Sequence, residues 1–409
     1  MQNDTSPHTL ASGPLAGLRV VDLTTILLGP FATQILGDMG ADVIKVEAPA
    51  GDPIRHVGPP PADTMGSVFL GANRNKRSVV MDLKRREVKE LFYKMIEGAD
   101  IFVHNMRPQA AARLEIDYAS LQQHKSDLIY CSTYGFRAGG PYGHKPAFDD
   151  MIQAACGLAS LQSQGHAPRY VTSAIADKIT ATTVVYAITM ALVHRLRTGR
   201  GQHVEVPMFE TLVAFNMVEH LYGAAYQPPR GEPGYPRALS PERRPYATQD
   251  GYIGVLPYTD DQWQSFFRIA GREDLANDER YGSLSKRLAN IDALYGELAA
   301  IVAERTTASW LDALDDANVP SMAVLSPADL VEDAHLRAVD FWHQHVDPEL
   351  GALRFAGIPT HFSDSPGSIH RMVPRLGEHT IEVLKELGVQ EKEIFALLED
   401  DALIQAAKR

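Results

Sequence analysis

The apolar and polar positions of the first 205 residues alternate between short strand patterns and longer helical ones. LAGLRVVDL (15–23) is rich in β-forming residues, GPFATQILGDMG (29–40) has helical spacing, and ADVIKVE (41–47) is again strand-like. A strand, a helix and a strand joined this closely imply that the two strands run parallel. The pattern then repeats, with strands predicted at 77–83, 100–105 and 127–135 and helices at 86–99 and 118–125. We therefore predict an α/β fold with a doubly wound parallel sheet.

The remainder of the chain predicts a second, smaller α/β domain. Residues 206–223 have the pattern of a helix, and the Pro-, Gly- and Arg-rich run 224–248 predicts a loop. A strand at 251–257 and several amphipathic helices follow. The predicted organisation is a disordered N-terminus (1–14), a large domain (15–205), a linker helix (206–223), a small domain (224–330) and a C-terminal segment (331–409).

The composition is that of a globular protein and narrows the function classes. The formal charge is −12 and no stretch concentrates Lys and Arg, so a nucleic-acid partner is not expected. Only two cysteines, Cys131 and Cys156, occur in 409 residues, which fits a reducing compartment. The longest apolar run (181–193) is shorter than the ~20 residues of a spanning helix and predicts a buried one. With no signal peptide, a cytoplasmic location and no membrane partner are expected.

A dinucleotide-binding enzyme is one alternative for the N-terminal half. Glu47, at the end of the second predicted strand, stands where such folds place an acid that binds the ribose. The first strand–helix turn reads TTILLGP, however, and lacks the G-x-G-x-x-G phosphate cradle. The sequence therefore does not favour an NAD-dependent reaction.

One aspartate has two interpretations. SAIADKITATT (173–183) opens a long apolar helix and places Asp177 near its first turn. An aspartate at this position commonly caps the helix and interacts favourably with its dipole. A carboxylate among Ala, Ile and Thr residues is also partly desolvated and could act as a nucleophile. The residues of this segment alone leave both roles open.

Six segments in one order resemble the class III CoA-transferases, the CaiB/BaiF-type family of formyl-CoA:oxalate and carnitine CoA-transferases. They are LAGLRVVDLTTILLGPFATQILGDMGADVIKVE, NRNKRSVVMDLK, FDDMIQAACG, SAIADKITATT, RTGRGQHVEVPMFE and PRLGEHTIEVLKELG. The resemblance extends from about residue 15 to about residue 390. It implies an interlocked, ring-like homodimer in which each chain has a Rossmann-like CoA-binding domain and a small domain. It also implies that the C-terminal segment returns to the large domain.

The same resemblance implies a reaction and a catalytic residue. Members of this family exchange CoA between an acyl-CoA and a free carboxylic acid through an enzymic aspartate, which in register is Asp177. A covalent route through an aspartyl anhydride and an aspartyl-CoA thioester divides one difficult step into easier ones. Neither a metal nor a permanently bound cofactor is expected, because the CoA thioester is itself a substrate.

Recognition of CoA requires cations for its phosphates and a slot for adenine. Asn105 and Arg113 match family positions, and Met106 replaces an aromatic residue there. Lys84 matches a CoA-contacting lysine and Met81 lies near it, whereas Lys145 matches only loosely. Two further candidate phosphate ligands are Arg55 and Arg77. A solvated surface cation is the alternative role for each of these charged residues.

Two positions near the expected reaction centre depart from family patterns. Leu27 replaces the glutamine that formyl-CoA transferases use in the first loop, which argues against oxalate or formate as substrate. Related 2-methylacyl-CoA racemases and epimerases carry a histidine before an aspartate; here Phe148 precedes Asp149. A phenyl ring cannot take a proton from an α-carbon, so racemisation is the weaker alternative. We therefore assign Leu27, Phe148 and Asp149 to the substrate-binding site.

The loop of the small domain suggests the class of acid. It lacks the glycine run of the formyl-CoA transferases and carries Arg237, Arg243 and Arg244. Because Arg grips carboxylates bidentately, our hypothesis is an acceptor larger than oxalate, with a dicarboxylate and a succinyl-CoA-like donor as one option. The alternative is that these arginines are ordinary surface residues of a loop.

A third functional alternative is a non-catalytic CoA-binding subunit of a heteromeric transferase, although such a subunit would not need Asp177.

Overall fold

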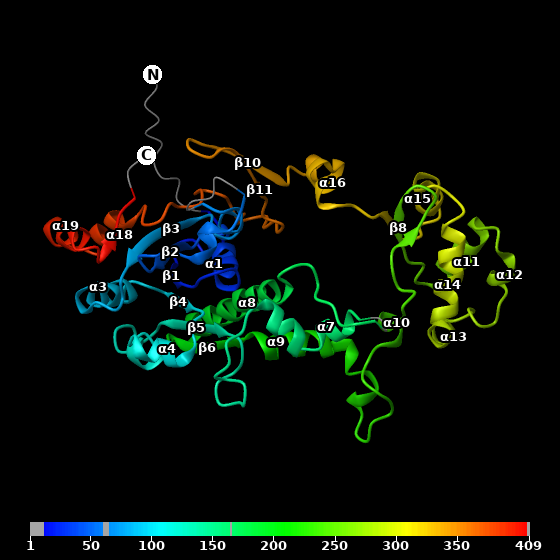
Figure 1. Cartoon of the computed structure of the whole chain (residues 1–409), viewed down its shortest axis with the longest axis horizontal. Coiled ribbons are helices and arrows are strands. Elements are labelled where there is room, and N and C mark those ends of the chain that lie inside the picture. Colours follow the sequence, from blue (N-terminus) through cyan, green and yellow to red (C-terminus); the bar gives the residue numbers. More distant parts are fainter. Residues whose placement is uncertain (1–11, 60–64, 164–165, 407–409) are drawn as a thin grey trace. The chain divides into compact units, whose positions relative to one another are not determined.

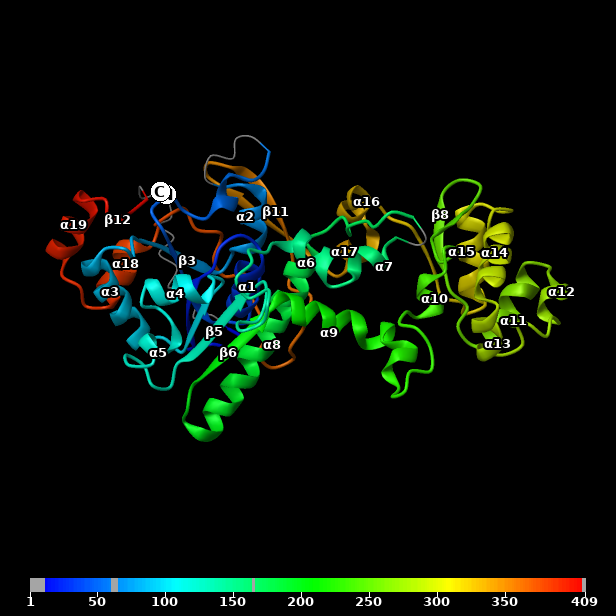
Figure 2. The same ribbon diagram turned by 60° about the horizontal axis from the view of Figure 1, so that its bottom comes forward.

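The structure is a computed structural model that describes residues 12–59, 65–163 and 166–406. Most of the predicted disordered N-terminus (1–14) therefore lies outside the described residues. The chain forms two compact units (Figures 1 and 2). Unit 1 comprises residues up to 156, 171–214 and 340–409, and unit 2 comprises 157–170 and 215–339.

Unit 1 is built on a seven-stranded sheet whose strand order is β12-β3-β2-β1-β4-β5-β6. All neighbouring pairs are parallel except β12 with β3, where the C-terminal part of the chain adds an antiparallel edge strand. The strands are β1 (Arg19–Leu23), β2 (Asp42–Glu47), β3 (Lys76–Met81), β4 (Ile101–His104), β5 (Ile129–Tyr134), β6 (Gln202–Pro207) and β12 (Leu403–Ile404).

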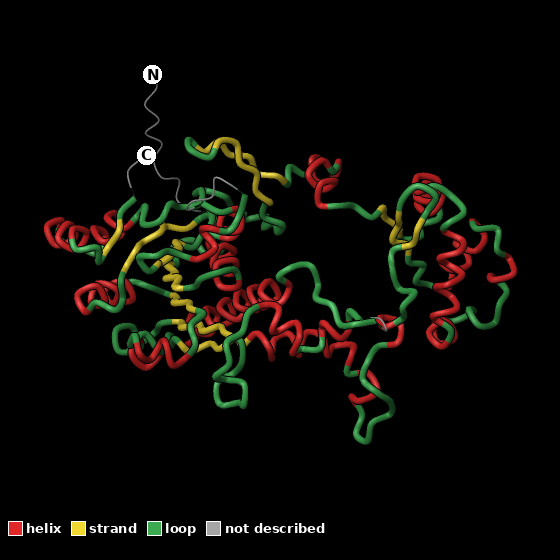
Figure 3. The backbone as a smooth tube through the Cα atoms, viewed as in Figure 1, coloured by secondary structure: helices red, strands yellow, loops and turns green. Residues whose placement is uncertain are grey.

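The strand order confirms the predicted Rossmann-like α/β fold. The direction of winding reverses between β1 and β4, and in such sheets ligands bind outside the carboxyl ends of the strands at this point. The helices of unit 1, visible as coils in Figure 3, connect and cover the strands. They are α1 (Leu28–Asp38), α2 (Ser67–Ala72), α3 (Arg86–Glu97), α4 (Pro108–Arg113), α5 (Tyr118–Leu121), α6 (Asp149–Ala155), α8 (Ile175–Thr198), α18 (Thr380–Glu386) and α19 (Glu391–Glu399), with a 3-10 turn at Pro53–His56 and a hairpin of β10 (Trp342–Asp347) and β11 (Gly351–Ala356).

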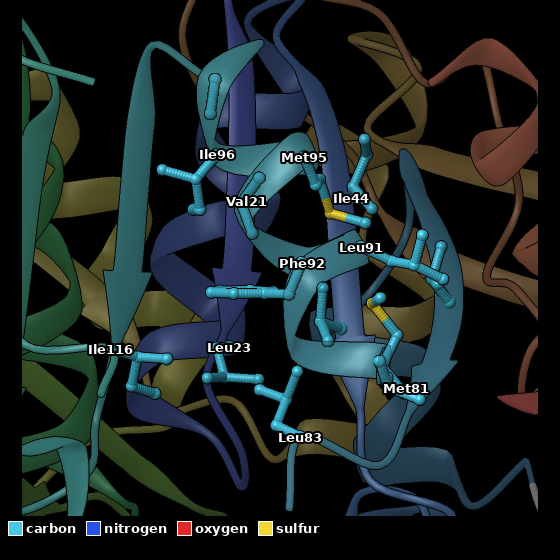
Figure 4. Packing of buried hydrophobic residues seen from close by; sticks show 14 of the residues in the cluster. Val21, Leu23, Ile44, Met81, Leu83, Leu91, Phe92, Met95, Ile96 and Ile116 are labelled. Carbon is cyan, nitrogen blue, oxygen red and sulfur yellow. The ribbon is translucent and has the colours of Figure 1, made fainter. Parts of the chain in front are cut away.

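A continuous hydrophobic core lies between the sheet and helix α3 (Figure 4). Leu91, Phe92 and Met95 of this helix face apolar side chains of the strands. Both faces of β1 to β5 are buried, which explains why these strands have largely apolar sequences. Met81 belongs to this core and is 1% exposed. The prediction of a CoA contact for Met81 does not fit this burial, and we assign the side chain to core packing.

Helix α8 packs one face against α1 and strands β5 and β6. Its other face exposes a stripe of large apolar side chains, so the predicted buried helix is buried on one face only in the single chain. Helix α8 is long and apolar enough to cross a membrane. The core helix of a soluble protein can have the same length and composition, and 33% of the most apolar 18-residue stretch of α8 is buried. The exposed side chains are Tyr186, Met190, Val193 and Leu196.

Unit 2 combines a small antiparallel sheet, in the order β7-β8-β9, with a cluster of helices. Aromatic residues dominate its core; Phe266 stacks on Trp310 with ring centroids 5.8 Å apart. Helix α9 (Met208–His220) joins the two units. The other elements are α7 (Leu158–Leu161), a 3-10 turn at Tyr222–Ala225, α10 (Pro236–Leu239), β7 (Tyr246–Ala247), β8 (Tyr252–Val255), α11 (Asp260–Ile269), α12 (Glu273–Ala276), α13 (Leu284–Ala289), α14 (Ile291–Val302), α15 (Thr307–Asp316), β9 (Ser321–Ala323), α16 (Pro327–Glu332) and α17 (Ala334–Ala338).

Candidate active site

A pocket of about 230 Å³ opens in unit 1 at the carboxyl ends of the parallel strands. Segments that follow β1, β4, β5 and β6 contribute to its wall, as expected at the point where the strand order reverses. The start of α8 closes one side of the pocket with Asp177. Its lining residues are Thr25, Ile26, Leu27, Leu28, Asn105, Arg107, Thr133, Tyr134, Gly135, Lys145, Pro146, Ala147, Phe148, Asp177 and Met208.

Asp177 lies in the first turn of α8, but another carboxylate caps that turn. The backbone N–H of Asp177 donates to Oδ2 of Asp149 at 3.0 Å. Oδ1 of Asp149 accepts a further hydrogen bond from Gln153 at 2.6 Å, which fixes the capping carboxylate in place. Throughout the described part of the chain, the carboxylate of Asp177 accepts no hydrogen bond and forms no ion pair. Asp149 thus caps the start of α8, and the side chain of Asp177 lines the pocket without a cap to form.

The surroundings of Asp177 disfavour its charge. Burial raises the pKa of its carboxyl group to about 7, the negative charge of Asp149 adds to this rise, and Lys178 opposes it. A poorly solvated, unpaired carboxylate of this kind is nevertheless a stronger nucleophile than a hydrated one. Strongly perturbed carboxyl groups in pockets are typical of reaction centres.

The wall beside Asp177 is apolar where related enzymes carry polar groups. Leu27, from the loop after β1, and Phe148, at the start of α6, both line the pocket. The Phe148 side chain is 65% exposed, so it does not serve the hydrophobic core. Neither side chain can accept a proton, and both leave room for an apolar segment of a substrate.

Asn105 and two cations, one from the segment after β4 and one from the segment after β5, line the pocket. The side-chain amide of Asn105 forms two hydrogen bonds with the backbone of Thr25. Its oxygen accepts from the Thr25 N–H at 3.1 Å, and its nitrogen donates to the Thr25 carbonyl at 2.8 Å. Lys145 also reaches the pocket, and its ammonium group lies 4.6 Å from the ring centre of Tyr142. Sequence reasoning missed Arg107, an exposed residue that donates to the carbonyl of His144. Its position two residues after Asn105, at a strand end, could have indicated it.

Two predicted phosphate ligands are engaged elsewhere. Arg55 is 1% exposed, and its guanidinium group binds both carboxylate oxygens of Glu47, at 2.8 and 2.7 Å. Arg77 is also buried and forms ion pairs with Asp42, Glu382 and Glu386. Neither side chain lines the pocket. We therefore correct both assignments, since these arginines hold segments of unit 1 together.

Three other CoA candidates lie outside the pocket wall. Lys84 is exposed and borders a separate, open pocket of about 540 Å³ that also contains Lys89 and Tyr93. Arg113 is exposed in the last turn of α4. Met106 is half-buried and packs against the core. These positions are compatible with surface contacts to a long ligand such as CoA, most of which must extend beyond 230 Å³.

The three predicted arginines of unit 2 gather on one pocket of about 460 Å³. Arg237, Arg243 and Arg244 line it, with no carboxylate among its lining residues. Nε of Arg237 donates to the hydroxyl of Tyr295 at 2.9 Å, while Arg244 is paired with Glu242. The Oγ atom of Ser321, another lining residue, is buried without a hydrogen-bond partner among the described atoms. The pocket is therefore suited to an anion.

The described residues contain no group of three His, Cys, Asp or Glu side chains arranged to hold a metal ion. The chemistry that the residues of the pocket themselves can supply is nucleophilic attack by Asp177, with Asn105, Arg107 and Lys145 available to bind an anionic or amide-bearing substrate.

Comparison with known proteins identifies the family of this chain. Residues 15–380 match CoA-transferase family III. The chain is 33% identical to the succinyl-CoA:mesaconate CoA-transferase of Haloarcula hispanica over 388 residues, 92% of this chain and 97% of the relative. It is 32% identical to the succinate–glutarate CoA-transferase of Agrobacterium fabrum over 391 residues, 93% and 97% of the two chains. A CaiB/BaiF family protein from Brucella suis has a similar crystal structure, with a TM-score of 0.78, 32% identity, and coverage of 92% of this chain and 100% of that one. The chain therefore belongs to CoA-transferase family III and is an enzyme that transfers CoA between carboxylic acids.

Proposed function

We propose that this CoA-transferase works through a covalent intermediate on Asp177. The carboxylate attacks the thioester carbonyl of the donor acyl-CoA, giving an aspartyl anhydride and CoA thiolate. The thiolate attacks the aspartyl carbonyl, which releases the donor acid and leaves an aspartyl-CoA thioester. The acceptor carboxylate then attacks this thioester, forming a second anhydride and freeing the thiolate again. Attack of the thiolate on the acyl carbonyl releases the new acyl-CoA and restores Asp177.

The observation that carries this proposal is the unpaired carboxylate of Asp177 in the pocket, beside a helix start already capped by Asp149. A structural aspartate in the first turn of α8 would be expected to accept backbone hydrogen bonds itself. Keeping a desolvated, unpaired charge costs free energy of folding, and such a cost is common at functional sites.

Trapping of the intermediate tests the proposal. The enzyme is incubated with succinyl-CoA without an acceptor and then treated with hydroxylamine or borohydride. Mass spectrometry of tryptic peptide 170–178 should show conversion of Asp177 to the hydroxamate or the alcohol. CoA transfer from succinyl-CoA to glutarate or mesaconate without any adduct would exclude the covalent route through this residue.

The two alternatives give other outcomes. Exchange of an α-proton for deuterium without CoA transfer would indicate a racemase, but Phe148 offers no base for that reaction. Binding of CoA with neither adduct nor transfer would indicate a non-catalytic subunit. The unpaired Asp177 favours the transferase over both.

The pKa of Asp177 predicts how activity depends on pH. Only the ionised carboxylate attacks, so kcat/KM should fall about tenfold per pH unit below pH 7 and level off above it. In Asp149→Asn the amide oxygen can still accept from the Asp177 N–H, but the neighbouring negative charge is gone. The acid limb of the profile should then move to lower pH. Asp150→Asn, at an exposed neighbouring position, is the matched control and should leave the limb in place. An unchanged limb in Asp149→Asn would contradict this account of the pKa.

We further propose that the acids are dicarboxylates with a succinyl-CoA-like donor. The relatives described above act, by their names, on succinyl, mesaconate and glutarate groups. The pocket of unit 2 is lined by three arginines, whose guanidinium groups are the side chains best suited to binding a carboxylate.

Replacement of Arg237 tests this assignment. Arg237→Met should raise KM for a dicarboxylate acceptor about tenfold or more, because the hydrogen bond that we propose between its guanidinium group and a carboxylate of the acceptor is lost. KM for a monocarboxylate of similar length should hardly change. Arg268→Met, an exposed arginine of the same unit, is the control in steady-state kinetics. An equal loss for both classes of acid, or in both variants, would refute a specific role.

A homodimer in the cytoplasm completes the proposal. The apolar stripe on α8, from Tyr186 to Leu196, exposes four large apolar side chains, and a second chain would cover it. Sedimentation should give about twice the 44.9 kDa mass of one chain. Replacement of exposed Met190 by Glu should weaken that association, and a wild-type monomer would contradict the proposal.

A further inference from the structure

The loop after β1 holds an isoleucine in an unfavourable backbone conformation. Ile26 has a φ of +70°, in the left-handed region, which β-branched residues rarely adopt. Such a conformation is strained and persists only where the surroundings enforce it. Ile26 and its neighbours Thr25 and Leu27 line the pocket that contains Asp177. The conformation of this loop therefore shapes the wall that faces the substrate.

A buried carboxylate enforces the conformation. The backbone N–H of Ile26 donates to Oδ1 of Asp52 at 3.1 Å. Oδ2 of Asp52 accepts from Nζ of Lys45 at 2.9 Å, and both side chains are 0% exposed. The same ammonium group donates to the carbonyl of Thr24 at 2.8 Å, so the ion pair binds the loop at two points.

Side chains from other segments bind the rest of the loop. Asn105, after β4, bonds both the N–H and the C=O of Thr25. Asp22 accepts from the backbone N–H of Thr24 at 2.9 Å and is paired with buried Lys76 at 3.1 Å. Consecutive backbone groups are thus held by four separate parts of unit 1. A loop that only connects a strand to a helix does not require so many constraints.

We propose that Asp52 is a positioning residue for CoA transfer, which acts by holding Ile26 in the left-handed conformation. The inference rests on the proposed function of Asp177 and extends it to a residue that lies outside the pocket wall. Lys45 is part of the device because it orients the Asp52 carboxylate toward Ile26. A precisely shaped loop matters because a displacement of about 1 Å at a reaction centre can lower the rate about a hundredfold.

A purely structural role is the competing explanation. Asp52 also accepts from the N–H of Ile54 at 3.2 Å and so caps the short turn Pro53–His56. In that case its replacement would lower stability, with no dependence on which residue occupies position 26.

The test combines Asp52→Asn with Ile26→Gly. The asparagine should turn its oxygen toward Lys45, leaving its amide N–H₂ group opposed to the Ile26 N–H donor. We expect Asp52→Asn to lower kcat about a hundredfold with little change in KM for the acyl-CoA. Glycine adopts the left-handed conformation without strain, so the factor by which Asp52→Asn lowers kcat should be about tenfold smaller in the Ile26→Gly background.

Each result decides the proposal. The same factor in both backgrounds, or a wild-type kcat for Asp52→Asn, would overturn it while leaving the proposed function intact. If the wild-type enzyme transfers no CoA between acids, the proposed function itself is wrong. In that case hydrogen exchange still tests the positioning role of Asp52. The Ile26 amide must exchange faster in Asp52→Asn than in the wild-type enzyme, because its hydrogen-bond acceptor is lost. If Asp52→Asn does not fold, the neutral pair Lys45→Gln with Asp52→Asn replaces it in both backgrounds.

Discussion

Asp177→Asn is expected to lower kcat for CoA transfer by at least about a thousandfold, since the covalent route has no other nucleophile. The variant should fold and bind acyl-CoA with an unchanged Kd, because the replaced carboxylate makes no hydrogen bond or ion pair within the described residues. Steady-state kinetics and calorimetric titration with acyl-CoA measure the two quantities.

The same variant should gain stability at neutral pH. The pKa of Asp177 is raised from 3.8 to about 7 on folding, so the unfolded chain loses this proton first as the pH rises. The wild-type enzyme therefore loses stability between about pH 4 and pH 7, and the neutral amide does not. The advantage of Asp177→Asn in free energy of unfolding should grow over this range and stay constant above it.

Asp150→Asn separates these effects from a general change in charge. Asp150 is also acidic and lies beside Asp149, but its side chain is exposed on α6. For Asp150→Asn, neither kcat nor the pH dependence of the free energy of unfolding should differ much from the wild-type values. Normal turnover by Asp177→Asn would remove this residue from the mechanism and leave its desolvated charge without a function.

The fold class was predictable because it depends on patterns that are local in sequence. The predicted strand 41–47 and helix 86–99 correspond to β2 (Asp42–Glu47) and α3 (Arg86–Glu97). Burial on both faces makes β1 to β5 largely apolar, and this feature is visible without any knowledge of their neighbours. The antiparallel pairing of β12 with β3 could not be derived in this way, since it joins residues more than 300 positions apart.

The candidate site was predictable only in part. Asp177, Asn105 and Lys145 reach one pocket because strand ends and the start of a long helix meet at the reversal of strand order. Arg55 and Arg77 resemble surface cations in the sequence, but their partners are set by the fold. Arg77 pairs with carboxylates of α18, which follow it by more than 300 residues.

Arg55→Met is expected to lower the free energy of unfolding of unit 1 by about 3–5 kcal/mol, because removal of one partner leaves a buried charge uncompensated. Glu47 would lose both hydrogen bonds to the guanidinium, and among the described residues it would keep the hydroxyl of Ser78 and the N–H of Asp52 as donors. The stacking of Arg55 on the ring of Phe69, with the guanidinium carbon 3.7 Å from the ring centre, would be lost as well. Urea denaturation measures the change.

The double variant Glu47→Gln with Arg55→Met should be more stable than Arg55→Met alone, since it removes the stranded charge together with its partner. Lys84→Met is the matched contrast, because Lys84 is exposed and its replacement should change the free energy of unfolding by less than about 0.5 kcal/mol. Should Lys84 contact a phosphate of CoA, the same replacement would raise KM for acyl-CoA without affecting stability. A stable Arg55→Met enzyme with weakened acyl-CoA binding would contradict our correction and return Arg55 to the CoA site.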